Sequence, residues 1–397
     1  MELARRLQRL DTAVFSELDA IGREVKARGV DIIDLSIGSP DLPPAPHVIR
    51  VLHEALDEPD AYRYALTEGL PEFKQAVADW YGERFGVELD PRREVLSLMG
   101  SQDGLAHIYL ALLNPGDTAL VPDPGYPIYS AGVIIAGGEI HPLPLLKENG
   151  FLPDLGAVPP EVARRAKVLV LNYPNNPVAA TAEVPFFEEV ADFARRYDIV
   201  VVHDAAYSEL AFDGYRPPSF LQARNAREVG VEFHSLSKTY NMAGCRLALA
   251  VGNARVLDAL RVLKSNIDYG VFRAVQKAGA AALRGPQDAV RQTAATYQRR
   301  RDVLIDGLRS LGWDVPRPKA SMFVWAPLPG GWTSSRDFAV TLVRESGVLV
   351  VPGVAFGARG EGYVRIALVC GENRLREVGR RPGVRAVIAR ETSQGRG

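Results

Sequence analysis

Residues 234–246 read HSLSKTYNMAGCR and follow the strand-like run VEF at 231–233. A single lysine, Lys238, stands among small hydroxyl residues at the end of a predicted buried strand, and Arg246 follows eight positions later. Burial disfavours the charged form of an amine and lowers its pKa. The stretch therefore predicts a strand that delivers a neutral, reactive amine to a cleft.

Short apolar runs that end in turn residues recur around this stretch, and helical patterns separate them. The runs are EVLSLMG, TALVPDPG, KVLVLNYPNNP, DIVVVHDAAY and RLALAVGN, and the helical patterns include DGLAHIYLALL and VPFFEEVADFARRY. Alternating strands and helices predict an α/β fold with a mostly parallel sheet and helices on both faces. Ligands of such sheets bind in the crevice at the carboxyl ends of the strands.

The pattern changes after about Gly285. A long charged helix is predicted at 289–312, followed by the strand-like runs SMFVWAPL, VLVVPG and YVRIALV. The first thirty or so residues have helical spacing and lead into the loop DIIDLSIGSPDLPPAP. We expect a large domain at 45–285 and a smaller α+β domain at 286–397, to which the N-terminal arm at 1–44 contributes.

Composition excludes several classes of protein. The 397 residues are 47% hydrophobic and 24% charged, with a formal net charge of −1, as in a globular protein of two domains without affinity for nucleic acid. Cys245 and Cys370 lie outside any CxxC or Cys/His cluster, which argues against structural zinc or a disulfide scaffold and favours the reducing cytoplasm. No apolar run approaches the roughly 18 residues that a membrane span needs. We expect no metal, nucleic acid or membrane partner.

A glycine turn at Gly100 precedes a helix predicted to begin near Ser101. Free backbone N–H groups at such a helix N-terminus form an anion site. The alternative is an ordinary turn in which Ser101 caps the helix. The nucleotide signatures GxxxxGK[ST] and GxGxxG are absent.

Three further motifs each allow two interpretations. Asp204, at the end of the run DIVVVHD, either meets a buried cation or caps a following helix. Asn175 and Asn176 in NYPNNP either offer amides to a planar ring or form a tight turn. Arg365, alternating with apolar residues in YVRIALV, makes either a buried ion pair or a carboxylate fork.

Together and in this order, GSQDGL, PGYPIY, NYPNNP, DAAYSEL, SLSK and YVRIAL resemble the class I/II aminotransferases, which are fold type I pyridoxal-phosphate (PLP) enzymes. The resemblance runs from GSPD at 38–41 to about residue 375. The segments KSNIDYGVFRAVQ and GSPDLPPAP look most like the branch of LL-diaminopimelate, aspartate and alanine aminotransferases. The resemblance implies an α/β PLP-binding large domain and a smaller α+β domain.

The resemblance also implies how the cofactor is bound. Lys238 would bond covalently to the cofactor aldehyde, which requires a neutral amine. Asp204 would pair with the protonated ring nitrogen, Tyr207 and Asn176 would bond the phenolic oxygen, and Tyr126 would lie against the ring face. The implied phosphate ligands are Ser101, Gln102, Ser235, Arg246 and, from a neighbouring subunit, Tyr64. A homodimer with shared active sites follows.

For the substrate, the resemblance implies that Arg365 binds the α-carboxylate, with Gly38 and Asn176 close by. Lys238 would move the Cα proton, and the amino group would pass from an amino acid to a 2-oxo acid such as 2-oxoglutarate. Residues 267–273 are a guess for part of the side-chain pocket. Arg273 there either faces an acidic side chain or is an exposed helix arginine.

The chain departs from the family pattern at two places. The usual N-P-T-G is Asn176-Pro177-Val178-Ala179, which loses a hydroxyl and a glycine, and Pro382-Gly383 interrupts the C-terminal helix, which predicts a short last helix or a disordered tail. Three alternative functions remain: a β-carbon–sulfur lyase on the same scaffold, a non-catalytic cofactor sensor, and an α/β protein with coincidental motifs.

Overall fold

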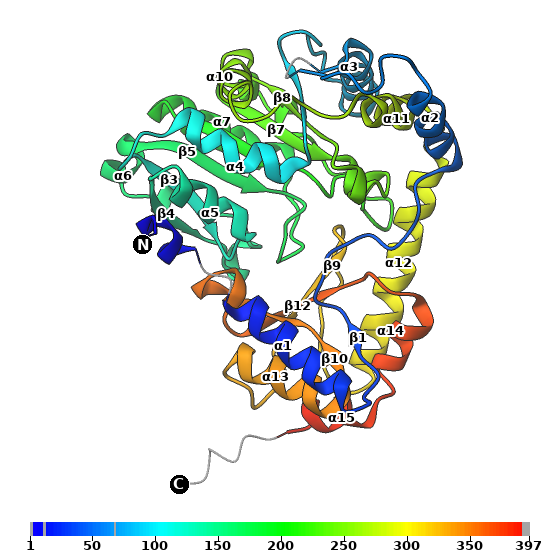
Figure 1. The fold of residues 1–397 in the computed structure, drawn as a ribbon. Helices are drawn as coiled ribbons and strands as arrows, with labels where there is room; N and C mark the ends of the chain where they lie inside the picture. The colour runs from blue at the N-terminus through cyan, green and yellow to red at the C-terminus, as the bar shows by residue number, and fades with distance from the viewer. Residues whose placement is uncertain (1–2, 11–12, 67–68, 391–397) are drawn as a thin grey trace.

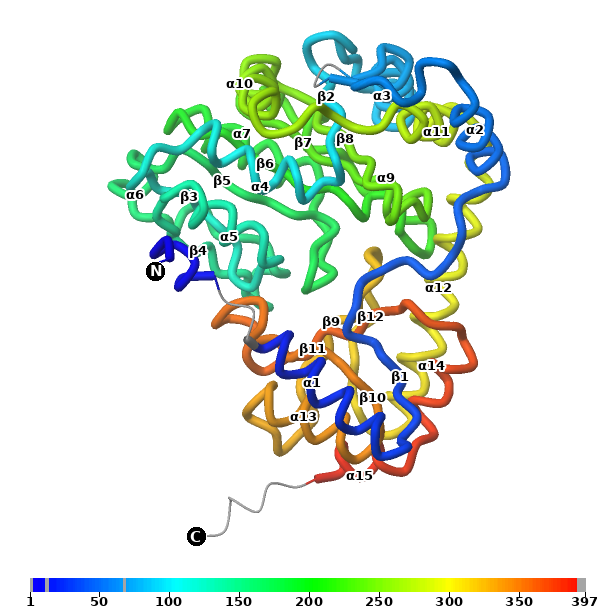
Figure 2. The backbone as a smooth tube through the Cα atoms, in the orientation of Figure 1, coloured from blue at the N-terminus to red at the C-terminus, as the bar shows by residue number. Residues whose placement is uncertain are grey.

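The structure, a computed structural model, describes residues 3–10, 13–66 and 69–390. A larger and a smaller unit face each other, and the long helix α12 (Asp288–Arg309) runs along one side of the molecule between them (Figure 1). The N-terminal segment between α1 and α2 runs beside α12 in the opposite sense, so segments from both halves of the chain contribute to the smaller unit (Figure 2).

The larger unit is built on one seven-stranded sheet. From edge to edge the strands are β2 (Val95–Leu98), β8 (Ala248–Gly252), β7 (Gly230–Ser235), β6 (Val200–Asp204), β5 (Ala166–Asn172), β3 (Thr118–Asp123) and β4 (Glu139–Pro144). Only β8 runs antiparallel to its neighbours. The prediction of a mostly parallel sheet is confirmed.

Helices cover both faces of this sheet. One face packs against α4 (Ser101–Leu112), α5 (Pro127–Ile135) and α10 (Ala254–Lys264), and the other against α3 (Pro71–Phe85), α7 (Val184–Tyr197) and α11 (Arg273–Arg284). Alternation along β5 shows the reason, because Val168 and Val170 join the first cluster while Leu169 and Leu171 join the second. The remaining helices of this unit are α2 (Pro46–Leu56), α6 (Pro160–Arg165), α8 (Ala226–Val229) and α9 (Leu236–Thr239).

The smaller unit combines strands from both ends of the chain. The antiparallel order is β11 (Val351–Pro352), β12 (Tyr363–Ala367), β9 (Phe323–Pro327), while β1 (Ile33–Asp34) pairs in parallel with β10 (Val348–Leu349). Its helices are α1 (Ala13–Ala27), α12, α13 (Ser335–Ser346), α14 (Glu372–Val378) and α15 (Pro382–Ile388). We propose domain boundaries at 44/45, before α2, and at 285/286, between α11 and α12.

The chain ends differ in detail from the prediction. A single N-terminal helix is wrong, because the structure has a 3-10 helix at Arg5–Arg9 and then α1. The first piece contacts the larger unit through the bond from Arg6 Nη1 to the Ile135 carbonyl, whereas α1 packs on α13 in the smaller unit. At the other end, a short last helix begins at Pro382, which needs no N–H bond there; residues 391–397 lie outside the described residues.

Among the described residues, no helix has both the length and the apolar character needed to cross a bilayer.

A buried carboxylate ties the central strands together. Glu232 on β7 accepts hydrogen bonds from the side chains of Tyr81, Ser219, His203 and His234 and from the Phe220 N–H, at 2.7–3.0 Å. His203, on β6, accepts the N–H of Tyr173, just after β5, through Nε2 (3.2 Å). The network therefore joins the ends of β5, β6 and β7 on the α3 and α7 face.

The charge of Glu232 depends on this network. Burial alone would raise the pKa of Glu232, but the bonds from His203 and His234 lower it well below its usual value. A lowered carboxyl pKa stabilises the fold above the unfolded pKa of about 4.3, and the stabilisation is lost as the pH falls below it.

We predict that Glu232→Gln lowers the free energy of unfolding by about 3 kcal/mol at pH 7, because an amide cannot accept all five bonds and brings its own N–H groups. Urea denaturation measures the change. The exposed Glu228→Gln, which loses only a surface pair with Arg195, should stay within about 0.5 kcal/mol of wild type. Equal effects of the two variants, or a difference that does not shrink as the pH falls below about 4, would contradict the prediction.

Candidate active site

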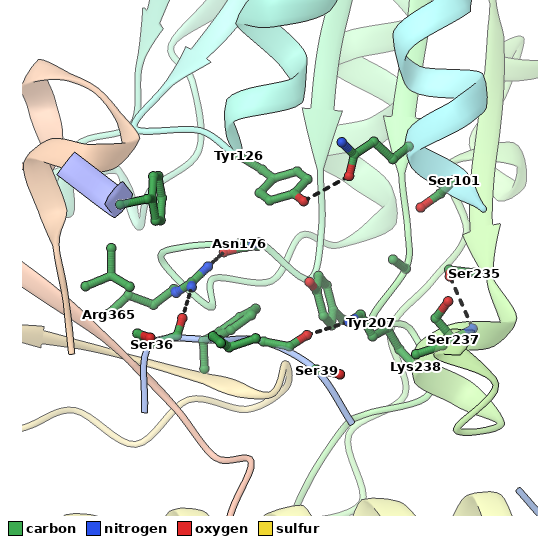
Figure 3. Close-up of a pocket in the computed structure, with 18 of the residues that line it drawn as sticks. Ser36, Ser39, Ser101, Tyr126, Asn176, Tyr207, Ser235, Ser237, Lys238 and Arg365 are labelled. Carbon is green, nitrogen blue, oxygen red and sulfur yellow. Dashed lines mark hydrogen bonds between the residues drawn. The ribbon is translucent and has the colours of Figure 1, made fainter. Parts of the chain in front are cut away.

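A cavity of about 720 Å³ lies where the two units meet, at the carboxyl ends of β5, β6 and β7. Side chains from both units converge on it (Figure 3). It brings together nearly all of the predicted site residues: Gly38, Ser101, Gln102, Tyr126, Asn176, Asp204, Tyr207, Ser235, Lys238, Arg246 and Arg365. Tyr64 lies outside this chain's cavity.

Lys238 lies on the short helix α9, directly after β7. Its Nζ donates a hydrogen bond to the Gly38 carbonyl at 2.6 Å. Burial, together with the nearby cations Arg365 and Arg246, lowers the pKa of Lys238 to about 8. A substantial fraction of the amine is therefore neutral near pH 7 to 8, as the sequence analysis expected.

Asp204 ends β6 with its side chain on the α4 and α5 face. It accepts the Tyr129 hydroxyl at 2.8 Å and the Ala206 N–H at 3.2 Å. Burial raises the pKa of Asp204 in spite of these bonds. No cation of the described residues makes a salt bridge with it, so its charge is open to a ligand cation. The helix-cap interpretation is wrong, since a turn and no helix follows.

Asn176 and Tyr207 connect the two sides of the cavity. The Asn176 side chain is a hydrogen-bond partner of the Tyr207 hydroxyl and accepts Arg365 Nη1 at 2.9 Å. The NYPNNP segment also forms the tight turn that was the alternative, with Asn175 Oδ1 accepting the Val178 N–H at 3.0 Å. The tight-turn interpretation is therefore confirmed, and the binding of a planar ring by this motif stays a prediction.

Arg365 is buried on β12 between two aromatic rings, 4.3 Å from the Phe323 centroid and 4.7 Å from the Phe356 centroid. Its guanidinium donates to Asn176 and, at 2.6 Å, to the Ser36 carbonyl, whereas Nε has no partner. Burial lowers the pKa of Arg365 to about 10, so it stays charged at neutral pH. The buried-ion-pair interpretation is wrong, because no described carboxylate pairs with Arg365. The other interpretation, in which Arg365 binds the carboxylate of a ligand, stays open.

The part of the cavity at the N-terminus of α4 is suited to an anion. Gly100, with a φ of 85°, is the N-cap of α4, so Ser101 is the first helical residue and its predicted role as a cap is wrong. A Cβ at residue 100 would lie 2.1 Å from Arg246 Nη2, so glycine is needed for the guanidinium to approach the helix end. Ser235 lies in the same cavity.

The sequence analysis missed residues that support the site without any signature of their own. Tyr129 holds Asp204, and Asn172 Nδ2 donates to the Asp204 carbonyl (2.7 Å) while Asn172 Oδ1 accepts the Asn176 N–H (2.6 Å). Tyr129 is three residues after Tyr126, within PGYPIY and its next helix, and Asn172 opens NYPNNP. Their positions beside predicted site residues were the only available signal.

Residues 267–273, the guess for part of the side-chain pocket, do not line this chain's own cavity, and their contribution to a pocket stays a prediction. Arg273 begins α11 and pairs with Asp60 at 2.5 Å, with 23% of its side chain exposed. It therefore faces an acidic side chain of the protein and is no exposed helix arginine. Tyr64 is exposed, with its ring 5.1 Å from that of Tyr269.

Asp103, His107 and Asp268 have ligand atoms close enough to hold a metal ion. The ammonium of Lys264 lies between the two carboxylates, 2.6 Å from Asp103 and 2.7 Å from Asp268. The lysine compensates one of the two negative charges from within the cluster, and the predicted absence of a metal stays a prediction.

Comparison with known proteins identifies the family. The profile of aminotransferase class I and II matches residues 30–381. The chain belongs to this family. It is 53% identical to the LL-diaminopimelate aminotransferase of Moorella thermoacetica over 95% of this chain and 96% of that protein. The corresponding protein of Syntrophobacter fumaroxidans is 54% identical over 94% and 96%.

Solved structures agree with this aminotransferase fold. BacF of Bacillus subtilis superposes with a TM-score of 0.93 at 37% identity, covering 98% of both chains. A probable N-succinyldiaminopimelate aminotransferase of Thermus thermophilus has a TM-score of 0.89 at 41% identity, covering 94% of this chain and all of that one. The protein is a PLP-dependent aminotransferase with a fold type I architecture. These relatives do not favour the lyase alternative.

The unpaired charges of the cavity fit PLP. Asp204 could face the ring nitrogen, Lys238 the aldehyde, and Arg246 with the α4 N-terminus the phosphate. Each group lacks a compensating charge among the described residues, which is what a site prepared for a charged cofactor requires.

We predict that covalent binding of PLP to the cofactor-free aminotransferase accelerates as the pH rises through about 8, because only the neutral amine of Lys238 attacks an aldehyde. Stopped-flow absorbance measures the rate. Lys238→Ala should fold normally and show no covalent band, whereas exposed Lys167→Ala should behave as wild type. A rate that does not depend on pH, or a band in Lys238→Ala, would contradict the role of Lys238.

Proposed function

We propose that this aminotransferase moves an amino group from LL-diaminopimelate to a 2-oxo acid such as 2-oxoglutarate. The observation that carries the proposal is the identity of about 50% with curated relatives of that name over nearly the whole chain. Aspartate and alanine, which the sequence analysis also considered as donors, are the alternatives.

The charges that line the cavity support a donor with two amino groups. LL-diaminopimelate carries an additional ammonium and carboxylate at the far end of its side chain. Besides Asp204, the carboxylates along the cavity are Asp19 on α1 and Asp34 on β1. Asp34 is bonded by Ser36, whereas Asp19 is largely exposed and, among the described residues, pairs with Arg23 outside the cavity lining at 2.9 Å. Asp19 therefore offers a carboxylate to a distal ammonium.

We propose that Arg365, helped by Asn176 and the Gly38 backbone, binds the α-carboxylate of the substrate. A Cβ at residue 38 would lie 2.5 Å from the Phe323 ring, so the chain passes close to that wall. The fixed carboxylate orients the Cα–H bond for cleavage in preference to the bond to the carboxylate.

We propose that residues lining the cavity make the contacts to the cofactor. Asp204 pairs with the ring nitrogen, Tyr207 and Asn176 bond the phenolic oxygen, and Tyr126 covers the ring. The phosphate ligands are Ser101, Gln102, Ser235 and Arg246. When bound, PLP supplies an aldehyde that condenses with amines and a ring that accepts electrons. Lys238 Nζ would take the proton from the substrate Cα and then donate it to the carbon that was the cofactor's aldehyde, so that the nitrogen stays with the cofactor.

We propose a homodimer in the cytoplasm. Exposed aromatic and aliphatic side chains gather around Tyr64, whose ring contacts Tyr269, while the Tyr62 ring contacts Phe272. A contiguous apolar patch is typical of a protein interface. Tyr64, distant from its own cavity, would then reach the phosphate in the partner's site. Both cysteines are free, as expected in a reducing compartment.

The donor can be identified by a half-reaction. We expect LL-diaminopimelate alone to convert the PLP absorbance to that of the amine form at least about threefold faster than aspartate or alanine, because one further exposed charge pair contributes about 0.7 kcal/mol. Addition of 2-oxoglutarate should restore the first spectrum. Asp19→Asn should lower the ratio of the LL-diaminopimelate rate to the alanine rate without lowering the alanine rate itself.

Equal rates for all three donors would contradict the proposed donor and leave the aminotransferase intact. Release of a thiol together with pyruvate and ammonia from an added amino acid that carries a sulfur substituent on Cβ would show a lyase in place of an aminotransferase.

The shared site has its own test. Light scattering should give twice the chain mass of 43.3 kDa, and Tyr64→Phe should weaken PLP binding about tenfold, since a bond to a charged phosphate is lost. Tyr62→Phe is the matched control, because Tyr62 is equally exposed and has no proposed ligand. A monomer, or normal affinity in Tyr64→Phe, would contradict a shared site.

A further inference from the structure

Tyr129 is a buried tyrosine that no motif assigned to the site. It lies on α5, is 1% exposed, and donates its hydroxyl to Asp204 Oδ2 at 2.8 Å. Burial and the neighbouring carboxylate raise the pKa of Tyr129 well above its usual value. The hydroxyl therefore remains a donor at any working pH.

We propose that Tyr129 is a positioning residue, which holds the Asp204 side chain in place as an anion so that it can pair with the cofactor's ring nitrogen. The inference rests on the proposed role of Asp204. Asp204 would otherwise have one direct partner for its carboxylate, the Ala206 N–H at 3.2 Å. A buried carboxylate with so few donors is costly to ionise.

The main chain of Asp204 is fixed separately. Asn172, on the neighbouring strand β5, donates to the Asp204 carbonyl and receives the N–H of Asn176. Asn172 thus holds the main chain at the end of β6, and Tyr129 holds the orientation of the Asp204 carboxylate. Only the second contact can act on the charge of Asp204, because only the hydroxyl bonds the ionisable group.

Other groups also act on that charge. The groups that interact electrostatically with Asp204 are Tyr109 on α4, Tyr126 just before α5, Tyr207, Lys238, His203 on β6 and His234 on β7. Among the described residues, the only side-chain hydrogen bond to its carboxylate comes from Tyr129.

Tyr109 offers a matched control. It is fully buried on α4, influences Asp204 only through space, and its hydroxyl has no hydrogen-bond partner. Tyr109→Phe removes the same atom from the same core cluster without touching the carboxylate. Its removal should be neutral or slightly stabilising.

The experiment measures the dissociation constant of PLP against pH for the whole chain, together with the thermal midpoint of the cofactor-free protein. Tyr129→Phe should bind PLP about tenfold more weakly, because a hydrogen bond to a charged group is lost. Its affinity should also fall at a higher pH on the acid side, since the hydroxyl lowers the pKa of Asp204 and its loss raises it. Tyr109→Phe should match wild type.

A double-mutant cycle completes the test. In an Asp204→Asn background, Tyr129→Phe should have little further effect on PLP affinity, because no charge is left to hold. Normal affinity in Tyr129→Phe, or the same loss in both backgrounds, would overturn the inference. A Tyr129→Phe chain that cannot fold would also overturn it, since the bond would then support the core. Normal affinity in Asp204→Asn would instead remove the proposed role of Asp204.

Discussion

The buried carboxylate of Glu232 is the interaction on which the rest of the site depends. Its five hydrogen bonds hold β6 and β7 together, and His203 extends the network to the chain that leaves β5. Strands alternate their side chains, so a polar network on one face leaves the other face free for ligand groups. Asn172, Asp204 and Ser235 occupy that other face, one on each strand. The network on the α3 and α7 face, the back of the sheet, therefore fixes the strands that carry the ligand groups on the α4 and α5 face, the front of the sheet.

The front of the sheet follows a different physical rule. There Asp204 and Arg365 are buried without opposite charges among the described residues, Arg246 is exposed at the end of the cavity, and the amine of Lys238 is largely buried. Burial of a charge without pairing is unfavourable to the empty protein and favourable to a ligand of matching charge. PLP and an amino-acid carboxylate, in the proposed binding mode, would supply the charges that match Asp204 and Arg365.

Much of the fold could be predicted from the sequence, and the failures have physical causes. The period of the apolar runs was sufficient for the strands, and α7 was predicted over the residues it occupies. The N-terminal helix was predicted as one because periodicity does not reveal that its two halves contact different units. Ser101 and Arg273 were misjudged for a similar reason: Gly100 takes the cap, and Asp60 is 213 residues from the arginine it pairs with. Pairing over such a distance leaves no local pattern.

By itself, the sequence determined the class of fold, the family and the cofactor, and it predicted the reactive lysine, because each is encoded in short motifs whose order is visible without coordinates. The tertiary structure alone decided how those motifs act together. It placed Arg365 beside Asn176, left Asp204 without a cation, and supplied the hydroxyl of Tyr129 from a helix 75 residues away. Such contacts depend on the packing of distant elements, and the charge of a buried group depends on everything that surrounds it.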